Sequence, residues 1–336
     1  MNTDTKTSFS FFAKLIVGLC ALAAMFAVSM SVGAADVGVR DVWLAMTTHA
    51  SGEHLTIIRE LRFPREVAAI IVGAALAVSG AIMQGLTRNP LADPGLLGLT
   101  SGANAALAFS IAIIPSLGYF GITIACMIGA TVGAALVIGI GAARRGGLSP
   151  LRMVLAGAAV SAFLYAVAEG IAIHFKISKD VSMWTAGGLI GTTWSQIQTI
   201  VPFIGIGILI ALLLSRQLTI LSVNEEAAVG LGLKTGRIKS LLYVTVILLA
   251  GASVALVGNL AFVGLMIPHI VRPLVGTDYR RVLPMTAVAG AAFMLLADTL
   301  ARTIHAPYES PMAAIIAIAG LPFFLIIVRK GVDSSS

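Results

Sequence analysis

Two acidic residues, Glu169 and Asp298, lie within long apolar stretches of the sequence. An ionisable side chain inside a membrane is costly, so each is a candidate for function, for example as a proton carrier. Asp298 also lies four residues before Arg302, a spacing that puts both side chains on one helix face and predicts an ion pair. Because both acids are near the ends of their stretches, we favour the ion pair over a proton relay.

Basic residues gather at the start of another apolar stretch. The segment RELRFPR places Arg59, Arg62 and Arg65 directly before about twenty apolar residues. His269 stands alone in its apolar run, and the sequence shows no nucleophile–base pair, no paired carboxylates and no cluster of metal ligands. We therefore expect no catalytic residue, no cofactor site and no metal site, and we do not expect this chain to be an enzyme.

The composition is that of a membrane protein. Of the 336 residues, 58% are hydrophobic and only 11% are charged, whereas soluble domains are about 25% charged. Long apolar runs predict transmembrane helices, because about 20 residues at ~1.5 Å each cross a lipid core of ~30 Å. The net charge of +7 fits basic loops on the cytoplasmic side of a lipid bilayer better than a nucleic-acid partner.

These runs predict an all-α polytopic membrane protein, with one transmembrane domain over residues 1–336 and about ten helices. The spans are expected at 11–34, 67–86, 95–114, 118–142, 153–173, 197–214, 240–257, 260–276, 283–300 and 311–328. The first run is longer than the roughly 7–15 apolar residues of a signal peptide, so we expect it to remain as a helix.

An even number of spans puts both termini on one side of the membrane. With both termini in the cytoplasm, about two thirds of the 22 lysines and arginines fall in cytoplasmic segments, in line with the positive-inside rule. Residues 59–65 then lie outside, against the usual bias, and the longest cytoplasmic segment is 215–239.

Residues 215–239 are too many for a simple connector. The spacing of Ser222 and Glu225 predicts a capping box at the start of a short helix, followed by a glycine turn and a basic lead into the next span. The run GLGLKTG lacks the lysine position of a phosphate-binding loop, so we do not expect this chain to hydrolyse ATP.

Four stretches together resemble the FecCD/BtuC-type permeases of bacterial ABC importers. They are Leu61–Ala103, Asn224–Leu233, Gly258–Arg272 and Leu295–Arg302. The resemblance implies ten helices per subunit and a dimer with a central path, formed with a second copy of the chain or with a related permease. It also implies a cytoplasmic ABC ATPase dimer, an extracytoplasmic substrate-binding protein and a location in the bacterial cytoplasmic (plasma) membrane.

The resemblance also assigns roles to particular residues. Arg62, Arg65 and Arg302 match family arginines that pair with acidic residues on the binding protein, whereas Arg59 lies outside the matched motif. The family's coupling loop, which lies in a groove of the ATPase, is matched by Glu225, Glu226, Gly230 and Gly232.

The family imports iron–siderophore complexes, haem or cobalamin. The C-terminal segment 306–331 looks most like siderophore members, with the hydroxamate type as our more specific expectation. We therefore expect a permease that moves an iron(III)–siderophore complex by alternating access driven by a partner ATPase. A haem or cobalamin permease, a proton-coupled secondary transporter that uses Glu169 or Asp298, and a structural scaffold remain alternatives.

Overall fold

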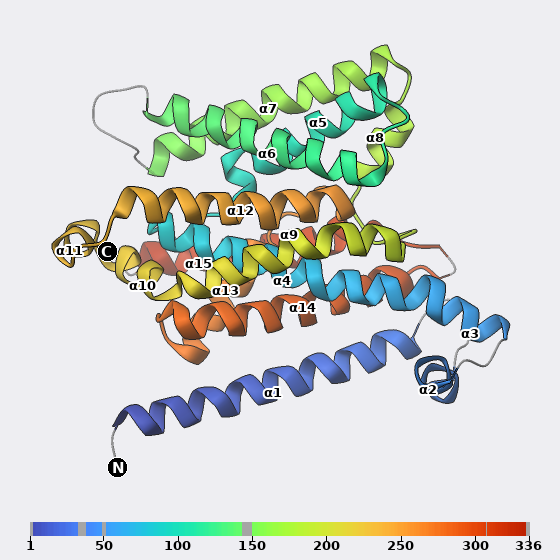
Figure 1. Cartoon of the computed structure of the whole chain (residues 1–336), viewed down its shortest axis with the longest axis horizontal. Coiled ribbons are helices and arrows are strands. Elements are labelled where there is room, and N and C mark those ends of the chain that lie inside the picture. Colours follow the sequence, from blue (N-terminus) through green and yellow to red (C-terminus); the bar gives the residue numbers. More distant parts are fainter. Residues whose placement is uncertain (1–2, 33–37, 49–51, 143–149, 307, 334–336) are drawn as a thin grey trace.

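The computed structural model describes residues 3–32, 38–48, 52–142, 150–306 and 308–333, and all regular secondary structure in these ranges is helical. The long helices run nearly side by side along one axis (Figure 1). The α-helices are α1 Thr3–Ser31, α2 Val39–Thr47, α3 Glu53–Ile57, α4 Phe63–Thr87, α5 Leu99–Ile113, α6 Tyr119–Ala142, α7 Pro150–His174, α8 Ser178–Thr185, α9 Trp194–Leu213, α10 Ser215–Val223, α11 Glu225–Gly230, α12 Thr235–Val257, α13 Val263–Val275, α14 Tyr279–Thr303 and α15 Met312–Asp333. A π-helical turn, η1 Ile58–Arg62, and a 3-10 turn, η2 Pro94–Leu97, complete the set.

Each predicted span overlaps one of these helices, and residues 33 and 34 of the first span lie outside the described residues. Among the described residues, seven helices are long and apolar enough to cross a membrane: α1, the continuous α3–η1–α4 helix, α6, α7, α9, α12 and α14. Shorter apolar helices at Leu99–Ile113, Val263–Val275 and Met312–Ile327 account for the other three predicted spans. The prediction of an all-α polytopic protein is confirmed.

The span predicted at 260–276 differs from the structure at its start. α13 has only 13 residues, which is about 20 Å and shorter than a lipid core of ~30 Å. The residues before it, 258–262, are not helical, and Gly258 and Phe262 have positive φ angles of 70° and 68°. A prediction from apolar runs could not see this break, because the apolar residues Leu260, Ala261 and Phe262 continue directly into the helix that follows.

Pro268 inside α13 leaves the carbonyl of Gly264 without its usual helical donor, because proline has no N–H. Gln84 on α4 supplies the missing donor. Its Nε2 donates to the carbonyl oxygens of Gly264 and Leu265, at 3.2 Å in each case. A side chain of α4 thus stabilises the beginning of α13.

α4 lies at the centre of the bundle, and glycines allow its neighbours to approach it closely. A Cβ atom at Gly73 would overlap the carbonyl oxygen of Gly290 on α14, and one at Gly80 would overlap that of Gly264 on α13. Small residues at such contacts let helix backbones pack against each other in a membrane. The glycine-rich composition is therefore used where α4 meets α13 and α14.

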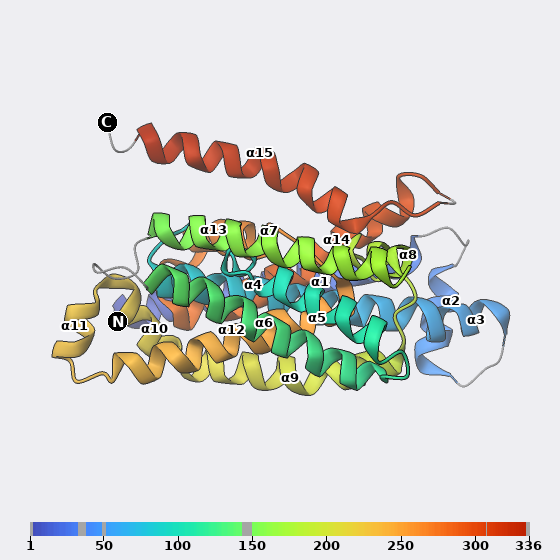
Figure 2. The same cartoon turned by 90° about the horizontal axis from the view of Figure 1, so that it is seen from above.

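The two ends of the bundle carry different elements. α10 and α11 lie at one end, together with the start of α1 and the end of α15, whereas α2 and α3 lie at the opposite end (Figures 1 and 2). α15 runs along the edge of the bundle in the second view (Figure 2). Any site near α2 and α3 is therefore separated from α10 and α11 by the full length of the bundle.

Candidate functional site

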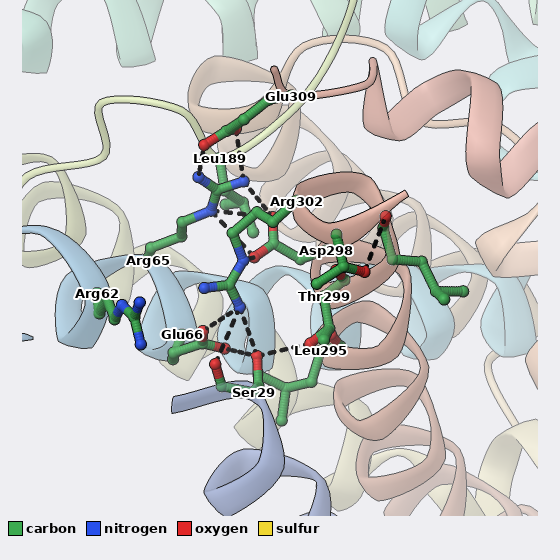
Figure 3. A network of polar contacts seen from close by, with 12 residues as sticks. Ser29, Arg62, Arg65, Glu66, Leu189, Leu295, Asp298, Thr299, Arg302 and Glu309 are labelled. Atoms are coloured by element: carbon green, nitrogen blue, oxygen red, sulfur yellow. Dashed lines mark hydrogen bonds and ion pairs between the residues drawn. The ribbon is translucent and has the colours of Figure 1, made fainter. Parts of the chain in front are cut away.

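A buried polar network joins α1, α4 and α14 near the end of the bundle that carries α2 and α3 (Figure 3). Arg302 Nη2 donates to Glu66 Oε1 at 2.5 Å and to Ser29 Oγ at 2.7 Å. Ser29 Oγ in turn donates to Glu66 Oε2 at 2.6 Å. Arg302 Nε lies 3.1 Å from Asp298 Oδ2, so the predicted ion pair between these two residues is confirmed.

Arg65 extends this network to the surface. Its Nε and Nη2 donate to the buried carboxylate of Asp298 at 2.8–3.0 Å. Its Nη1 and Nη2 also donate to Glu309, at 2.8 and 2.9 Å. The Arg65 side chain is 11% exposed and that of Glu309 is 33% exposed. Glu309 lies in the connection between α14 and α15, so one guanidinium links three parts of the chain.

The three arginines expected to bind a partner protein come together here, but two of them turn inward. Arg62 is 7% exposed and its Nη1 donates to the carbonyl oxygen of Met30 at 2.8 Å, while Arg302 is 6% exposed. Arg65 is only slightly more exposed, at 11%, and Glu309, at 33%, is the member of this network that reaches solvent most among the residues described above. The docking role of Arg62, Arg65 and Arg302 stays a prediction, and Arg65 is the one of the three that contacts the more exposed Glu309.

Arg59, which the sequence left without a role, fastens α2 to the long helix. Its Nε donates to the carbonyl oxygen of Ala45 at 2.9 Å, and its Nη2 donates to that of Thr48. The carbonyl of Arg59 accepts a hydrogen bond of 3.1 Å from Trp194 Nε1 at the start of α9. These contacts occur at the π-helical turn η1, and π turns are frequent at functional sites.

The predicted coupling segment forms α10, α11 and the turn that leads into α12. Its prediction as a short helix, a glycine turn and a basic lead agrees with the structure, but the capping residue differs. Asn224, not Ser222, caps α11, with Asn224 Oδ1 accepting from the backbone N–H of Glu226 at 2.8 Å. Gly232 has a φ of +78°, which a residue with a side chain rarely adopts.

Lys239, which the sequence did not single out, attaches this segment to α12. Its ammonium donates to Glu225 Oε1 at 2.5 Å, and this hydrogen bond holds the pKa of Glu225 below its ordinary value. Nearby, Val223, Val229 and Leu231 are at least 58% exposed. An apolar surface beside a fixed helix is typical of a protein–protein contact.

The connection between α13 and α14 is held at the same end of the bundle. Asp278 caps α14 and binds the guanidinium of Arg280. Burial alone would raise the pKa of Asp278, but hydrogen bonds from Arg280 and Thr219 outweigh it and lower the pKa overall. Because Thr219 belongs to α10, its 3.1 Å contact with Asp278 joins the coupling segment to α14.

A cavity of about 720 Å³ lies between α5, α7 and α15. Its walls also include the turn after α4 and residues 259–262 before α13. Both of these segments lie outside the α-helices. Asn104 on α5 is 6% exposed, and its Oδ1 has no hydrogen-bond partner among the described residues. A second cavity of about 230 Å³ shares Asn104 and Tyr165 with the first and includes Glu169.

The model of the FecCD transport family matches residues 21–330. This chain belongs to the FecCD transport family. Within the family it is 44% identical, over 94% of its length and 83% of the relative's, to the iron(3+)-hydroxamate import system permease protein FhuB of Bacillus subtilis. It is 41% identical, over 90% of both chains, to the Fe(3+)-citrate import system permease protein YfmD of the same organism.

The fold of this FecCD chain also matches a solved structure described as a metal-chelate type ABC transporter in an inward-facing conformation. The match has a TM-score of 0.80 and 27% identity, and it covers 95% of this chain and 99% of the other. The chain is thus a multi-pass permease subunit of an ABC importer in the bacterial inner membrane, and the resemblance seen in its motifs is confirmed.

Proposed function

We propose that this permease carries an iron(III)–siderophore complex of the hydroxamate type across the cytoplasmic membrane. The observation that carries the proposal is the 44% identity over 94% of the chain to a permease named for iron(3+)-hydroxamate import. Asp298 is paired with both Arg65 and Arg302, which favours a structural role for it over that of a proton carrier.

The orientation that fits this function puts both termini, α10 and α11 in the cytoplasm, and α2, α3 and the buried network outside. This agrees with the excess of lysine and arginine in the segments assigned to the cytoplasm. It also places the exposed apolar residues Val223, Val229 and Leu231 where a cytoplasmic partner can contact them.

In this orientation the α10–α11 segment contacts an ABC ATPase dimer and transmits ATP-driven movement to α12 and α14. The predicted contact residues are Glu225, Glu226, Gly230 and Gly232. Two attachments support the assignment: Lys239 binds Glu225, and Thr219 binds Asp278. A segment that is attached to two membrane-spanning helices can transmit a movement of the ATPase to both of them.

On the outer side, a substrate-binding protein delivers the complex, and its acidic residues pair with Arg65, with Arg62 and Arg302 supporting the same face. Arginine suits this role because its guanidinium binds carboxylates through paired, charge-assisted hydrogen bonds. A second permease subunit, either a copy of this chain or a related one, completes the path.

The test is uptake in cells that carry or lack this chain. Cells with the chain should accumulate radioiron from a ferric trihydroxamate, and deletion should abolish that uptake while leaving unrelated iron uptake unchanged. Haem and cobalamin serve as matched cargoes. Uptake of either in place of the trihydroxamate, in a chain-dependent manner, would assign the permease to that cargo and overturn the proposal.

A further inference from the structure

The 720 Å³ cavity is lined in part by two segments of the chain that are not α-helical. One is the turn after α4, and the other is the 258–262 segment before α13. Irregular backbone within a membrane protein is tolerated where it lines a cavity or is buried in protein, and transporters place substrate sites at such breaks. The volume is within the range of about 300–1,000 Å³ that small-molecule sites occupy.

The charge of this cavity is one-sided. The described residues that line it include no lysine, arginine or histidine, and Asp93 is their one acid. Asp93 Oδ1 accepts the backbone N–H of Gly95 at 2.8 Å, so the carboxylate is fixed in place. An anion that left water for this cavity would lose hydration, find no cation among these residues, and be repelled by Asp93.

The cavity surface is mostly apolar, and several neutral hydrogen-bonding groups lie among its lining residues. Asn104 is the most telling, because a buried amide oxygen without a partner requires an explanation. It can accept a hydrogen bond from an amide or hydroxyl group of a passing molecule. Ser101 and Ser161, joined by a hydrogen bond of 3.2 Å between α5 and α7, lie in the same wall.

We propose that this cavity selects its cargo by charge: it admits uncharged, amide-bearing iron(III) hydroxamate complexes, disfavours anionic chelates, and uses Asn104 as the hydrogen-bond acceptor for the cargo. The inference rests on the proposed function and narrows it. Iron(III) bound by three singly charged hydroxamates is electrically neutral, whereas its complexes with polycarboxylates or catecholates are anionic. The cavity therefore suits neutral hydroxamate complexes and disfavours anionic polycarboxylate or catecholate complexes. This selection adds to the selection by the binding protein.

The experiment compares two cargoes of nearly the same shape in cells that contain the complete importer. Both are ferric complexes of one trihydroxamate ligand that has a terminal amine. In the neutral cargo this amine is acetylated, and in the anionic cargo it is succinylated, which adds one carboxylate. Both are used at concentrations that saturate the purified binding protein equally, so that delivery is matched. We expect the wild-type permease to move the neutral complex at least about tenfold faster.

Two variants test whether the cavity sets this ratio. Ser161→Lys places a cation in the cavity wall. It should lower the ratio of the import rate of the neutral cargo to that of the succinylated cargo several-fold. Asn104→Leu should lower the rate for the neutral cargo about tenfold with unchanged membrane abundance. Thr199→Val, a change at a half-buried residue of α9 that does not line the cavity, is the matched control and should leave both rates unchanged.

Equal rates for the two cargoes in the wild type would overturn the inference, as would a ratio that Ser161→Lys does not change. If Ser161→Lys fails to accumulate in the membrane, Thr100→Lys places the same charge in another wall of the cavity and is judged by the same ratio. Failure of the wild type to import the neutral cargo at all would instead refute the proposed function, so the two failures are distinguishable.

Discussion

Arg65 on α4 and Glu309, in the connection that leads to α15, bind each other through two hydrogen bonds of 2.8 and 2.9 Å although 244 positions separate them. The same guanidinium binds the buried Asp298. Glu309 thus occupies the exposed side of an arginine that we assign to a binding protein, in the way that a carboxylate of that protein would. α15, which follows this connection, supplies Leu321 and Phe324 to the cavity wall.

If a partner carboxylate replaces Glu309, removing Glu309 removes an internal competitor. We expect Glu309→Gln to tighten binding-protein affinity several-fold and Arg65→Glu to weaken it, with assembly with the ATPase unchanged in both. Titration of the binding protein onto the purified transporter measures both effects. Glu60→Gln, an exposed acid on η1, is the control, and weaker binding by Glu309→Gln would contradict the competition.

The buried pair Arg302–Glu66 predicts an asymmetric loss of stability. Arg302→Met leaves Glu66 buried without its cation and should destabilise the protein by about 3–5 kcal/mol. Glu66→Gln should cost less, because Arg302 keeps its contact with Asp298. Thermal unfolding of the detergent-solubilised protein would show this order, and an equal loss in both variants would argue against the network as described.

The glycine contacts of α4 predict which small residues cannot be enlarged. Gly80→Ala should prevent α4 and α13 from approaching and abolish stable expression, because the added Cβ would overlap backbone rather than a movable side chain. Gly205→Ala on α9 is the matched control, since a Cβ there meets nothing within 4 Å. Membrane levels and melting temperature are the readouts. Normal levels for Gly80→Ala would contradict the close contact between α4 and α13 at this position.

The coupling segment makes different predictions for its two glycines. Gly232→Val is strained because φ is +78°, and we expect it to uncouple ATP hydrolysis from uptake by distorting the turn. Gly230 has open space around it and no positive φ, so Gly230→Ala should be tolerated, whereas a bulky residue there should block the ATPase contact. The ratio of ATP hydrolysed to cargo imported distinguishes these cases, and a normal ratio in Gly232→Val would remove the turn from the coupling path.

Much of this architecture could be predicted because apolar runs and helix length are local properties of the chain. The exceptions are long-range. Nothing near Asn104 or Lys239 in sequence indicates an unpaired amide in a cavity wall or an ion pair to Glu225. Of the residues that the sequence analysis missed, Glu66 was the easiest to predict, because an acid directly after the arginine motif and at the start of an apolar run is itself unusual.

The inward turn of Arg62 and Arg302 was beyond sequence reasoning for the same cause. Each donates a hydrogen bond to α1, Arg62 to Met30 and Arg302 to Ser29, and that helix lies at the edge of the bundle with no motif that marks its partners. Matching motifs identified which arginines gather at this end of the molecule, whereas only the packed structure shows which residues each of them binds.

The most direct measurement is ATP-driven uptake of a radioiron-labelled neutral trihydroxamate into proteoliposomes that contain the permease, its ATPase and its binding protein. We predict accumulation that requires ATP and persists when the proton gradient is collapsed, and that falls strongly in Gly232→Val. Accumulation that needs the proton gradient and not ATP, or no accumulation of this cargo in the complete system, would contradict the account.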